Sequence, residues 1–178
     1  MEFELINQAM STALEQLRDR DRHLLIHGLH ERSISHRLAV YLETLLPNFN
    51  VDCEYNGNVD ADNGKKYIYF LKANAPRLKI KLKDEEIDAD TIERSIYPDI
   101  IVHRRGGNGP ENNLLVAEIK LTSSTVDVGW DKEKLSRFTS SEFENRFDYQ
   151  YGVFILLGVK EQFGLVEVEW YRDGGRFL

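Results

Sequence analysis

Three charged side chains stand at the ends of two short apolar runs, and their chemistry is that of metal ligands with an amine beside them. Asp99 precedes the run 100–102, whereas Glu118 and Lys120 close the run 114–120. Side chains alternate along a strand, so Glu118 and Lys120 point to the same face. Two carboxylates and an amine are costly to bury unless something compensates their charge. A hard divalent cation, which prefers oxygen ligands, would provide that compensation.

The two apolar runs are expected to be neighbouring strands joined by a turn. Each is nearly continuously apolar, which is typical of a strand buried on both faces. Residues 104–113 between them are rich in glycine and asparagine, so we predict an antiparallel hairpin. The start of the first strand then lies beside the end of the second, and Asp99 can meet Glu118 and Lys120. The alternative is a salt-bridged strand end in which Lys120 neutralises two structural acids.

The pair Pro98-Asp99, followed by a variable hairpin and then Glu118-Ile119-Lys120, resembles the motif of the PD-(D/E)XK nuclease superfamily. Both pieces lie in predicted apolar strands that follow a predicted helix and a first strand, which is the context that the motif requires. The resemblance implies an α/β fold of the restriction-endonuclease-like type, with an αβββαβ core, a mixed central sheet flanked by helices, and an extra N-terminal helix. It covers about residues 31–157.

The resemblance also implies roles for the site residues. Asp99, Glu118 and the main-chain carbonyl of Ile119 would bind Mg²⁺, for which Mn²⁺ could substitute, and Lys120 would orient or help to deprotonate the attacking water. An acid on the first core helix often completes the metal site in this superfamily, and Glu31 has the right direction for it. The implied reaction is metal-dependent hydrolysis of phosphodiester bonds, with DNA as the expected substrate.

A helix predicted for residues 31–46 determines whether Glu31 reaches the site. Its apolar residues repeat at helical spacing, and Glu31 stands three residues before Ile34, at the N-terminal end of the same stripe. Two interpretations of Glu31 remain open: it completes the metal site, or it only stabilises the helix N-terminus through the macrodipole. Arg32 and Arg37 bring two guanidinium groups to this region, where they suit phosphate contacts or a solvated helix face.

Hydrophobic periodicity predicts the remaining elements. Two amphipathic helices are expected, at 3–17 and 130–138, and further strands at 51–56, 149–158 and 165–171. In the second helix Leu135 and Phe138 should face inward and Lys134 outward, which makes Lys134 a third candidate phosphate contact. The polar segment 57–94 should be an insertion between the first two core strands. Its alternating lysines either contact a phosphate backbone or protect a sheet edge from pairing.

Length and composition are those of a soluble globular protein. The 178 residues, 42% hydrophobic and 30% charged, suit one domain spanning 1–178 with a real core. No apolar run is long enough to span a membrane and no leader pattern is present, so we expect a cytoplasmic protein without a membrane partner. The single cysteine, Cys53, excludes an internal disulfide, and we expect it in the core.

A net charge of −7 argues against a protein that coats nucleic acid indiscriminately. It does not exclude a nuclease, because acids around a metal add to the negative charge. No separate DNA-reading domain is recognisable, so a homodimer or a partner subunit would have to supply specificity. Two other classes stay open: a catalytically silent nucleic-acid-binding or protein-assembly module of the same fold, and a metal-stabilised interaction module without a nucleic-acid partner.

Overall fold

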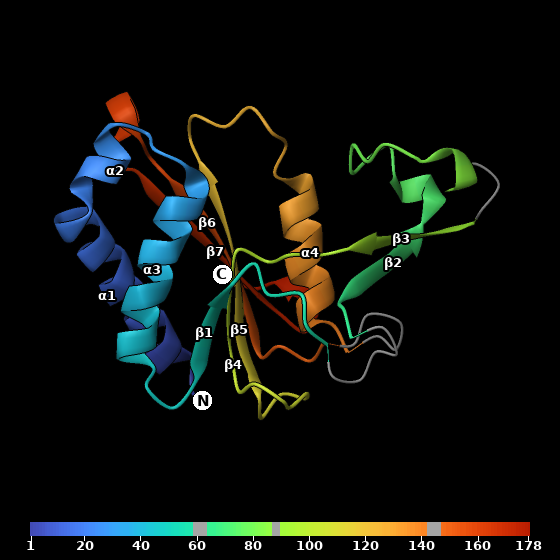
Figure 1. Ribbon diagram of the computed structural model, residues 1–178, viewed down its shortest axis with the longest axis horizontal. Coiled ribbons are helices and arrows are strands. Elements are labelled where there is room, and N and C mark those ends of the chain that lie inside the picture. The colour runs from blue at the N-terminus through green and yellow to red at the C-terminus, as the bar shows by residue number, and fades with distance from the viewer. Residues whose placement is uncertain (59–63, 87–89, 142–146) are drawn as a thin grey trace.

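The computed structural model describes residues 1–58, 64–86, 90–141 and 147–178 (Figure 1). Within these ranges the fold is mixed α/β, and its main sheet has six strands in the order β1-β4-β5-β6-β7-β8. The β5–β6 pair is parallel and the other pairs are antiparallel. The strands are β1 Asn50–Cys53, β4 Ile100–His103, β5 Asn113–Leu121, β6 Tyr151–Leu157, β7 Val166–Arg172 and β8 Gly175–Arg176.

Helices cover both faces of this sheet (Figure 1). On one face lie α1 Phe3–Arg20, α2 Arg22–Ile26 and α3 Glu31–Leu45, and on the other lies α4 Gly129–Thr139. Three single-turn 3-10 helices, η1 Lys72–Asn74, η2 Asp84–Glu86 and η4 Lys160–Gln162, complete the helical elements of the described chain. None of the described helices combines the length and the apolar character needed to cross a membrane.

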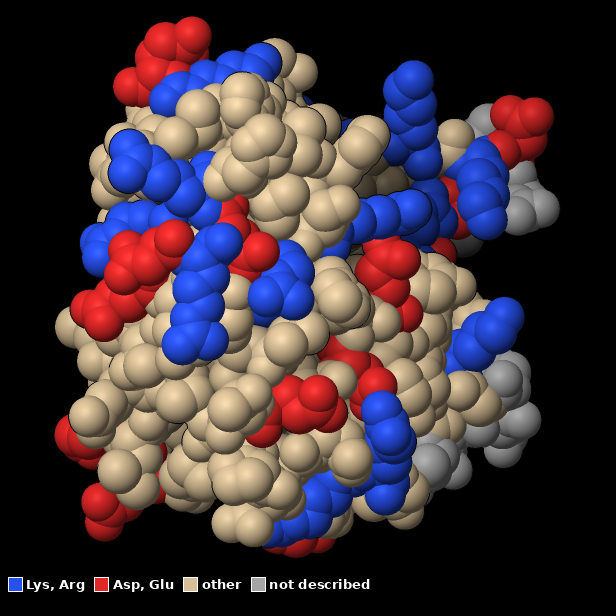
Figure 2. Space-filling model, turned by 60° about the vertical axis from the view of Figure 1, so that its left-hand side comes forward, with Lys and Arg blue, Asp and Glu red and all other residues tan. Residues whose placement is uncertain are grey.

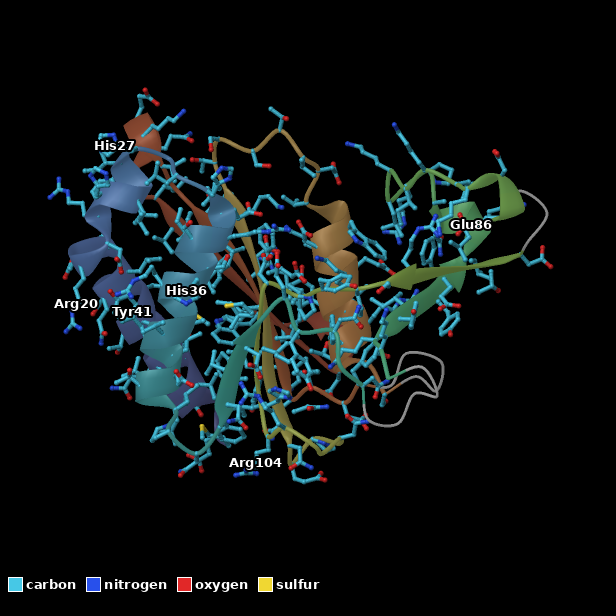
Figure 3. All side chains as sticks on the ribbon, in the orientation of Figure 1. Arg20, His27, His36, Tyr41, Glu86 and Arg104 are labelled. Atoms are coloured by element: carbon cyan, nitrogen blue, oxygen red, sulfur yellow. The ribbon has the colours of Figure 1, made fainter. Side chains whose placement is uncertain are left out.

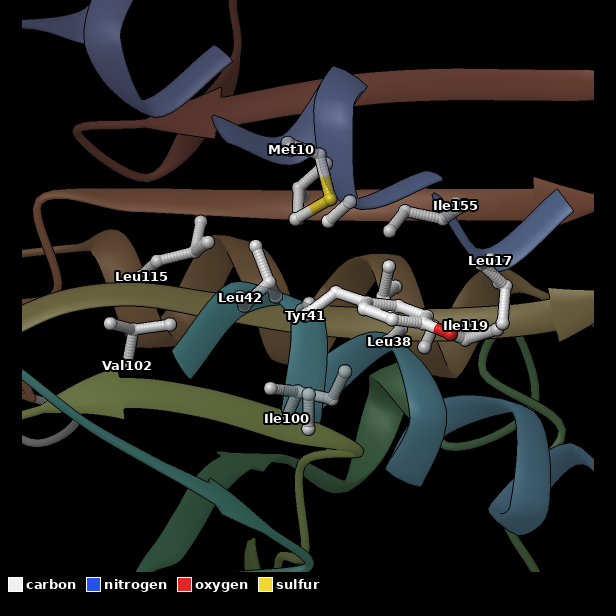
Figure 4. Packing of buried hydrophobic residues seen from close by; sticks show 14 of the residues in the cluster. Met10, Leu17, Leu38, Tyr41, Leu42, Ile100, Val102, Leu115, Ile119 and Ile155 are labelled. Carbon is white, nitrogen blue, oxygen red and sulfur yellow. The ribbon is translucent and has the colours of Figure 1, made fainter. Parts of the chain in front are cut away.

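Alternation along β4 and β5 divides the apolar side chains between two cores. Ile100 and Val102 pack with α1 and α3, whereas Ile101, between them, packs with α4. The larger core is closed by α1 and α3, whose buried residues repeat every three or four positions, as a helix with one buried face requires. Figure 4 shows this core, with Met10 and Leu38 facing the strands.

The predicted hairpin is present, and its register determines where the charged residues meet. Ile100 pairs with Ala117 in the antiparallel β4–β5 ladder, so the chain just before β4 lies beside the second half of β5. From β5 the chain returns through α4 to β6, which pairs in parallel. A parallel neighbour needs such a crossover, and the crossover lays α4 along β5.

The insertion forms a small arm of its own, which projects from the main sheet (Figure 1). It contains a two-stranded antiparallel sheet of β2 Tyr67–Leu71 and β3 Thr91–Ser95. Two ion pairs connect it to α4 and the turn before it: Arg77 with Glu133 at 3.1 Å and Lys79 with Asp127 at 2.7 Å. On the face shown in Figure 2, Lys and Arg side chains gather on this arm, while both signs are interspersed elsewhere.

Two local predictions were wrong for the same reason. The strand expected at 51–56 ends at Cys53, because Glu54 has a positive φ of 50° and leaves the ladder. Cys53 is exposed rather than buried in the core. Both residues lie at or just after the end of β1, which is at the edge of the sheet and is covered less than the central strands. A local alternating pattern does not reveal whether a strand is central or at an edge.

Candidate active site

Asp99 is held across the β4–β5 hairpin. Its Oδ2 accepts a hydrogen bond of 2.7 Å from the main-chain N–H of Ile119, and its main-chain carbonyl accepts one of 3.3 Å from Glu54. Pro98, which cannot donate a main-chain hydrogen bond, is buried just before it. The carboxyl group is therefore positioned beside β5, as the sequence predicts.

Glu118 is buried in the middle of β5 and meets α4. Only 1% of the residue is exposed, and Oε2 accepts a hydrogen bond of 2.6 Å from Nζ of Lys134. Its other oxygen, Oε1, has no hydrogen-bond partner within the described part of the chain. A buried carboxylate oxygen without a donor is energetically unfavourable, so Glu118 is only partly compensated by Lys134.

Lys134 does not face outward, and the prediction that it contacts phosphate from an exposed helix face was wrong. The residue is 8% exposed, and its ammonium group lies between Glu118 and Oδ1 of Asp131, which is 3.1 Å away. The physical reason is the charge on Glu118. An unpaired buried carboxylate costs more than burying the lysine that neutralises it, and the apolar stem of a lysine packs well against a core.

Lys120 joins the two faces of the sheet at its end. Its Nζ lies 3.2 Å from Oδ2 of Asp131 on α4 and 3.5 Å from Oε1 of Glu31, the first residue of α3. Although α3 packs on the face opposite α4, Glu31 reaches around the sheet end because it stands at the helix terminus. The predicted residues Glu31, Asp99, Glu118 and Lys120 are thus brought together. With Asp131 and Lys134 they form what we call the acid–lysine cluster, which comprises Glu31, Asp99, Glu118, Lys120, Asp131 and Lys134.

The cluster carries more acid than base. Its four carboxylates and two ammonium groups give a formal charge of −2 when all are ionised. Burial raises the pKa of Asp99 to about 6, although the Ile119 N–H and Lys134 oppose the shift. Burial likewise raises the pKa of Glu118 well above its usual range. For Lys134 burial alone would lower the pKa, but attraction to Glu118 and Asp131 outweighs it and the net shift is upward.

These properties fit a divalent cation. The excess charge of the cluster equals the charge of one such ion, the donors are carboxylate oxygens, and Glu118 Oε1 lacks a partner among the described residues. Ile119 was predicted to offer its main-chain carbonyl to the ion, and its main-chain N–H donates to Asp99 Oδ2. No set of three or more His, Cys, Asp or Glu side chains in the described ranges is already arranged around one point as metal ligands. Glu31, Glu118 and Asp131 contact lysine ammonium groups instead, and Asp99 accepts from the Ile119 N–H.

Arg32 lies next to the site, whereas Arg37 is engaged elsewhere. Arg32 Nε is 2.7 Å from Oε1 of Glu54, whose main chain contacts Asp99, and its side chain is largely exposed. Arg37 Nε lies 3.0 Å from Asp21 Oδ2, and Arg37 also donates to the Tyr41 hydroxyl. Figure 3 labels Tyr41, which is only 4% exposed, and Arg20, whose guanidinium lies 5.8 Å from the centre of the Tyr41 ring. Of the two arginines, Arg32 is thus the one placed to turn toward a ligand at the cluster.

An open hollow gives access to the Glu31 side of the cluster. Its volume is about 400 Å³, and it lies between the α2–α3 turn and the chain that follows β5. It is lined by Gly28, Leu29, His30, Glu31, Leu121, Ser123 and Ser124. The hollow leaves one edge of an otherwise buried charge group open to solvent and to a ligand.

Asp131 and the inward direction of Lys134 were missed from the sequence, although a signal was present. Leu135 and Phe138 were correctly predicted to face inward and are buried. On a helix, residues four positions apart lie on the same face, and the residues four positions before Leu135 and Phe138 are Asp131 and Lys134. Two charged residues on a buried helix face indicate a buried charge partner, and Glu118 is that partner for Lys134.

The chain was also compared with known proteins. Neither a family model, nor a curated protein, nor a solved structure matches it.

Proposed function

We propose that this protein is a metal-dependent nuclease that hydrolyses phosphodiester bonds, with DNA as its substrate. The observation that carries the proposal is the acid–lysine cluster, with its formal charge of −2 and the buried Oε1 of Glu118, which has no partner among the described residues. A purely structural charge group would be expected to satisfy its most buried oxygen. The motif Pro98-Asp99 with Glu118-Ile119-Lys120, which lies on one hairpin, supports the same interpretation.

Each residue has a definite part in this reaction. Asp99, Glu118 and the Ile119 carbonyl would hold Mg²⁺ or Mn²⁺, and Glu31 would add a ligand from α3. When bound, the ion would polarise the phosphoryl oxygens and lower the pKa of a bound water. Lys120, which is only partly buried, would orient the attacking water as a hydrogen-bond donor. Burial alone would lower the pKa of Lys120, but Asp131 and Glu31 outweigh it and the net shift is upward, so its side chain is an ammonium group rather than a base. Arg32 would contact a neighbouring phosphate from its exposed position beside Glu54.

We also infer a restriction-endonuclease-like fold in one domain spanning 1–178, with the core at about 31–157 and an insertion at about 57–94. The described elements α3, β1, β4, β5, α4 and β6 follow the αβββαβ order in sequence. The exposed arginine and lysines of the arm, Arg77, Lys79, Lys81 and Lys83, are suited to a phosphate backbone beside the site. A second subunit would contribute further specificity.

The second candidate is a catalytically silent module of the same fold that binds nucleic acid or a protein. The observation in its favour is that Lys134 and Lys120 already neutralise half of the cluster's acids without a metal. Such a protein would bind DNA, or a protein partner, with the same affinity in EDTA and in Mg²⁺.

The deciding experiment is a cleavage assay with Mg²⁺ and Mn²⁺ on single-stranded, double-stranded and branched DNA, with RNA as a comparison. We expect cleavage by the wild type, none by Asp99→Ala, and none by Lys120→Ala even though the latter still binds the ion. Lys132→Ala is the matched control, because Lys132 lies on α4 but pairs with Glu169 at 2.9 Å, outside the cluster. DNA binding without cleavage of any substrate would favour the silent module.

A further inference from the structure

We propose that Lys134 is the resident counter-cation of the metal site, and that a divalent ion binds there by replacing the Lys134 ammonium group at Glu118. The inference rests on the proposed metal-dependent function, which it deepens by assigning a control over ion binding. Lys134 lies on α4, outside the Asp99, Glu118 and Lys120 motif.

The geometry shows that Lys134 and an ion would compete for the same carboxylate. The Lys134 ammonium lies 2.6 Å from Glu118 Oε2, and both side chains are almost completely buried. One ammonium group satisfies only half of this carboxylate, because Oε1 remains without a partner among the described residues. A divalent ion that took both oxygens would bring two positive centres within a few ångströms of each other, where like charges repel strongly.

Lys134 already contacts a second carboxylate besides Glu118. Oδ1 of Asp131 lies 3.1 Å from the same ammonium group, three residues earlier on the helix. Asp131 also lies 3.2 Å from Lys120 through its other oxygen. Lys134 would therefore keep one carboxylate partner after an ion took Glu118.

Two consequences follow from the exchange. Without an ion, Lys134 neutralises Glu118 and keeps the fold stable, so folding does not depend on metal. With an ion, part of the binding free energy is spent on separating Lys134 from Glu118, so the ion is bound more weakly than the carboxylates alone would bind it. Lys134 would thus keep the site closed at low ion concentration.

The test is calorimetric titration of Mn²⁺ and of Mg²⁺ into four metal-free proteins: the wild type, Lys134→Met, Lys134→Arg and Lys132→Met. Lys134→Met retains an apolar stem and removes the charge, and it should bind the ion at least tenfold more tightly, equivalent to about 1.4 kcal/mol. Lys134→Arg keeps a cation and should stay close to the wild type. Lys132→Met, from the same helix, should leave the affinity unchanged. Equal or weaker binding by Lys134→Met would overturn the inference.

Thermal unfolding gives a second readout that does not depend on activity. In EDTA, Lys134→Met should unfold at a lower temperature than the wild type, and saturating Mn²⁺ should remove most of that difference. If this variant folds only when Mn²⁺ is present, the ion has replaced the lysine and the inference is supported. If it does not fold even with Mn²⁺, or if Mn²⁺ leaves the difference unchanged, Lys134 is a structural counter-ion and the inference fails.

The outcomes also separate this inference from the proposed function. Tighter ion binding by Lys134→Met in a protein that cleaves no nucleic acid would support the exchange and contradict the nuclease. Cleavage by the wild type, with no change of ion affinity in Lys134→Met, would support the nuclease and contradict the exchange. If none of the four proteins binds an ion, both proposals fall.

Discussion

Replacing Asp99 by asparagine should stabilise the metal-free protein. The pKa of Asp99 is raised from 3.8 to about 6, so at pH 7 the folded state holds an ionised carboxylate that it disfavours. A shift of about two pKa units corresponds to roughly 3 kcal/mol. An asparagine side chain at this position has no charge, and its carbonyl oxygen can still accept from the Ile119 N–H. We therefore expect the free energy of unfolding to rise by about 2–3 kcal/mol for Asp99→Asn.

The assay is equilibrium denaturation in EDTA and in saturating Mg²⁺, with thermal unfolding in parallel. For a chain of this length about 2–4 °C accompanies each kcal/mol, so Asp99→Asn should unfold roughly 5–10 °C higher in EDTA. Mg²⁺ should stabilise the wild type by mass action, by about 2.7 kcal/mol at one hundred times the dissociation constant. The Asp99→Asn variant should gain much less stability from Mg²⁺, so the stability difference between the two proteins should shrink or reverse.

The pH dependence has a definite sign. The folded state binds a proton at Asp99 more tightly than the unfolded state does, so between pH 6 and pH 4 the metal-free wild type should gain stability relative to Asp99→Asn as the pH falls. Asp127→Asn is the matched control, because Asp127 is exposed, pairs with Lys79 at 2.7 Å and has a lowered pKa. The Asp127→Asn variant should be slightly less stable than the wild type and should keep its response to Mg²⁺. An Asp99→Asn variant less stable than the wild type in EDTA would refute the reasoning.

Two further predictions concern the fold. Burial lowers the pKa of Lys66 from 10.5 to about 8, so the unfolded state binds more protons between these values. As the pH rises from about 8.5 to 10, the free energy of unfolding of the wild type should therefore increase by about 2 kcal/mol relative to that of Lys66→Met, measured by urea denaturation. A stability difference that does not change with pH would contradict the burial of a charged amine. Replacing Leu38, a fully buried residue of α3, by alanine should lower the free energy of unfolding by about 2–5 kcal/mol, whereas the same change at the exposed Leu5 should lower it by under about 0.5 kcal/mol. Similar losses would show that α3 does not close the core.

Much of the fold was predictable because its elements carry strong local patterns. The helices at 3–17 and 31–46 and the apolar strand at 149–158 are confirmed as α1, α3 and β6, with boundaries shifted by up to three residues. The hairpin was predictable because turn residues separate two runs too apolar to face water, and its register confirms that Asp99 lies beside Glu118. Their roles in binding and catalysis remain predictions.

Other features depend on partners distant in sequence. The β3 strand buries little besides Ile92, so its sequence carries almost no apolar alternation, and it forms by pairing with β2. Lysine is rarely buried in proteins, so Lys134 was assigned to the surface. Only the position of α4 against β5, a consequence of the crossover to β6, brings that lysine to Glu118. Local pattern predicts which face a residue occupies, but not which charge lies opposite.

The pairing of Glu118 with Lys134 limits how this chain can change over evolutionary time. Loss of either residue alone would strand a buried charge, and such a change typically costs several kcal/mol, a large part of the stability of a domain. Loss of both together, in favour of apolar side chains of similar volume, would be tolerated or even stabilising. Descendants that lack one of these two charges should therefore lack the other as well, and positions 118 and 134 should vary as one unit although they lie sixteen positions apart in the sequence.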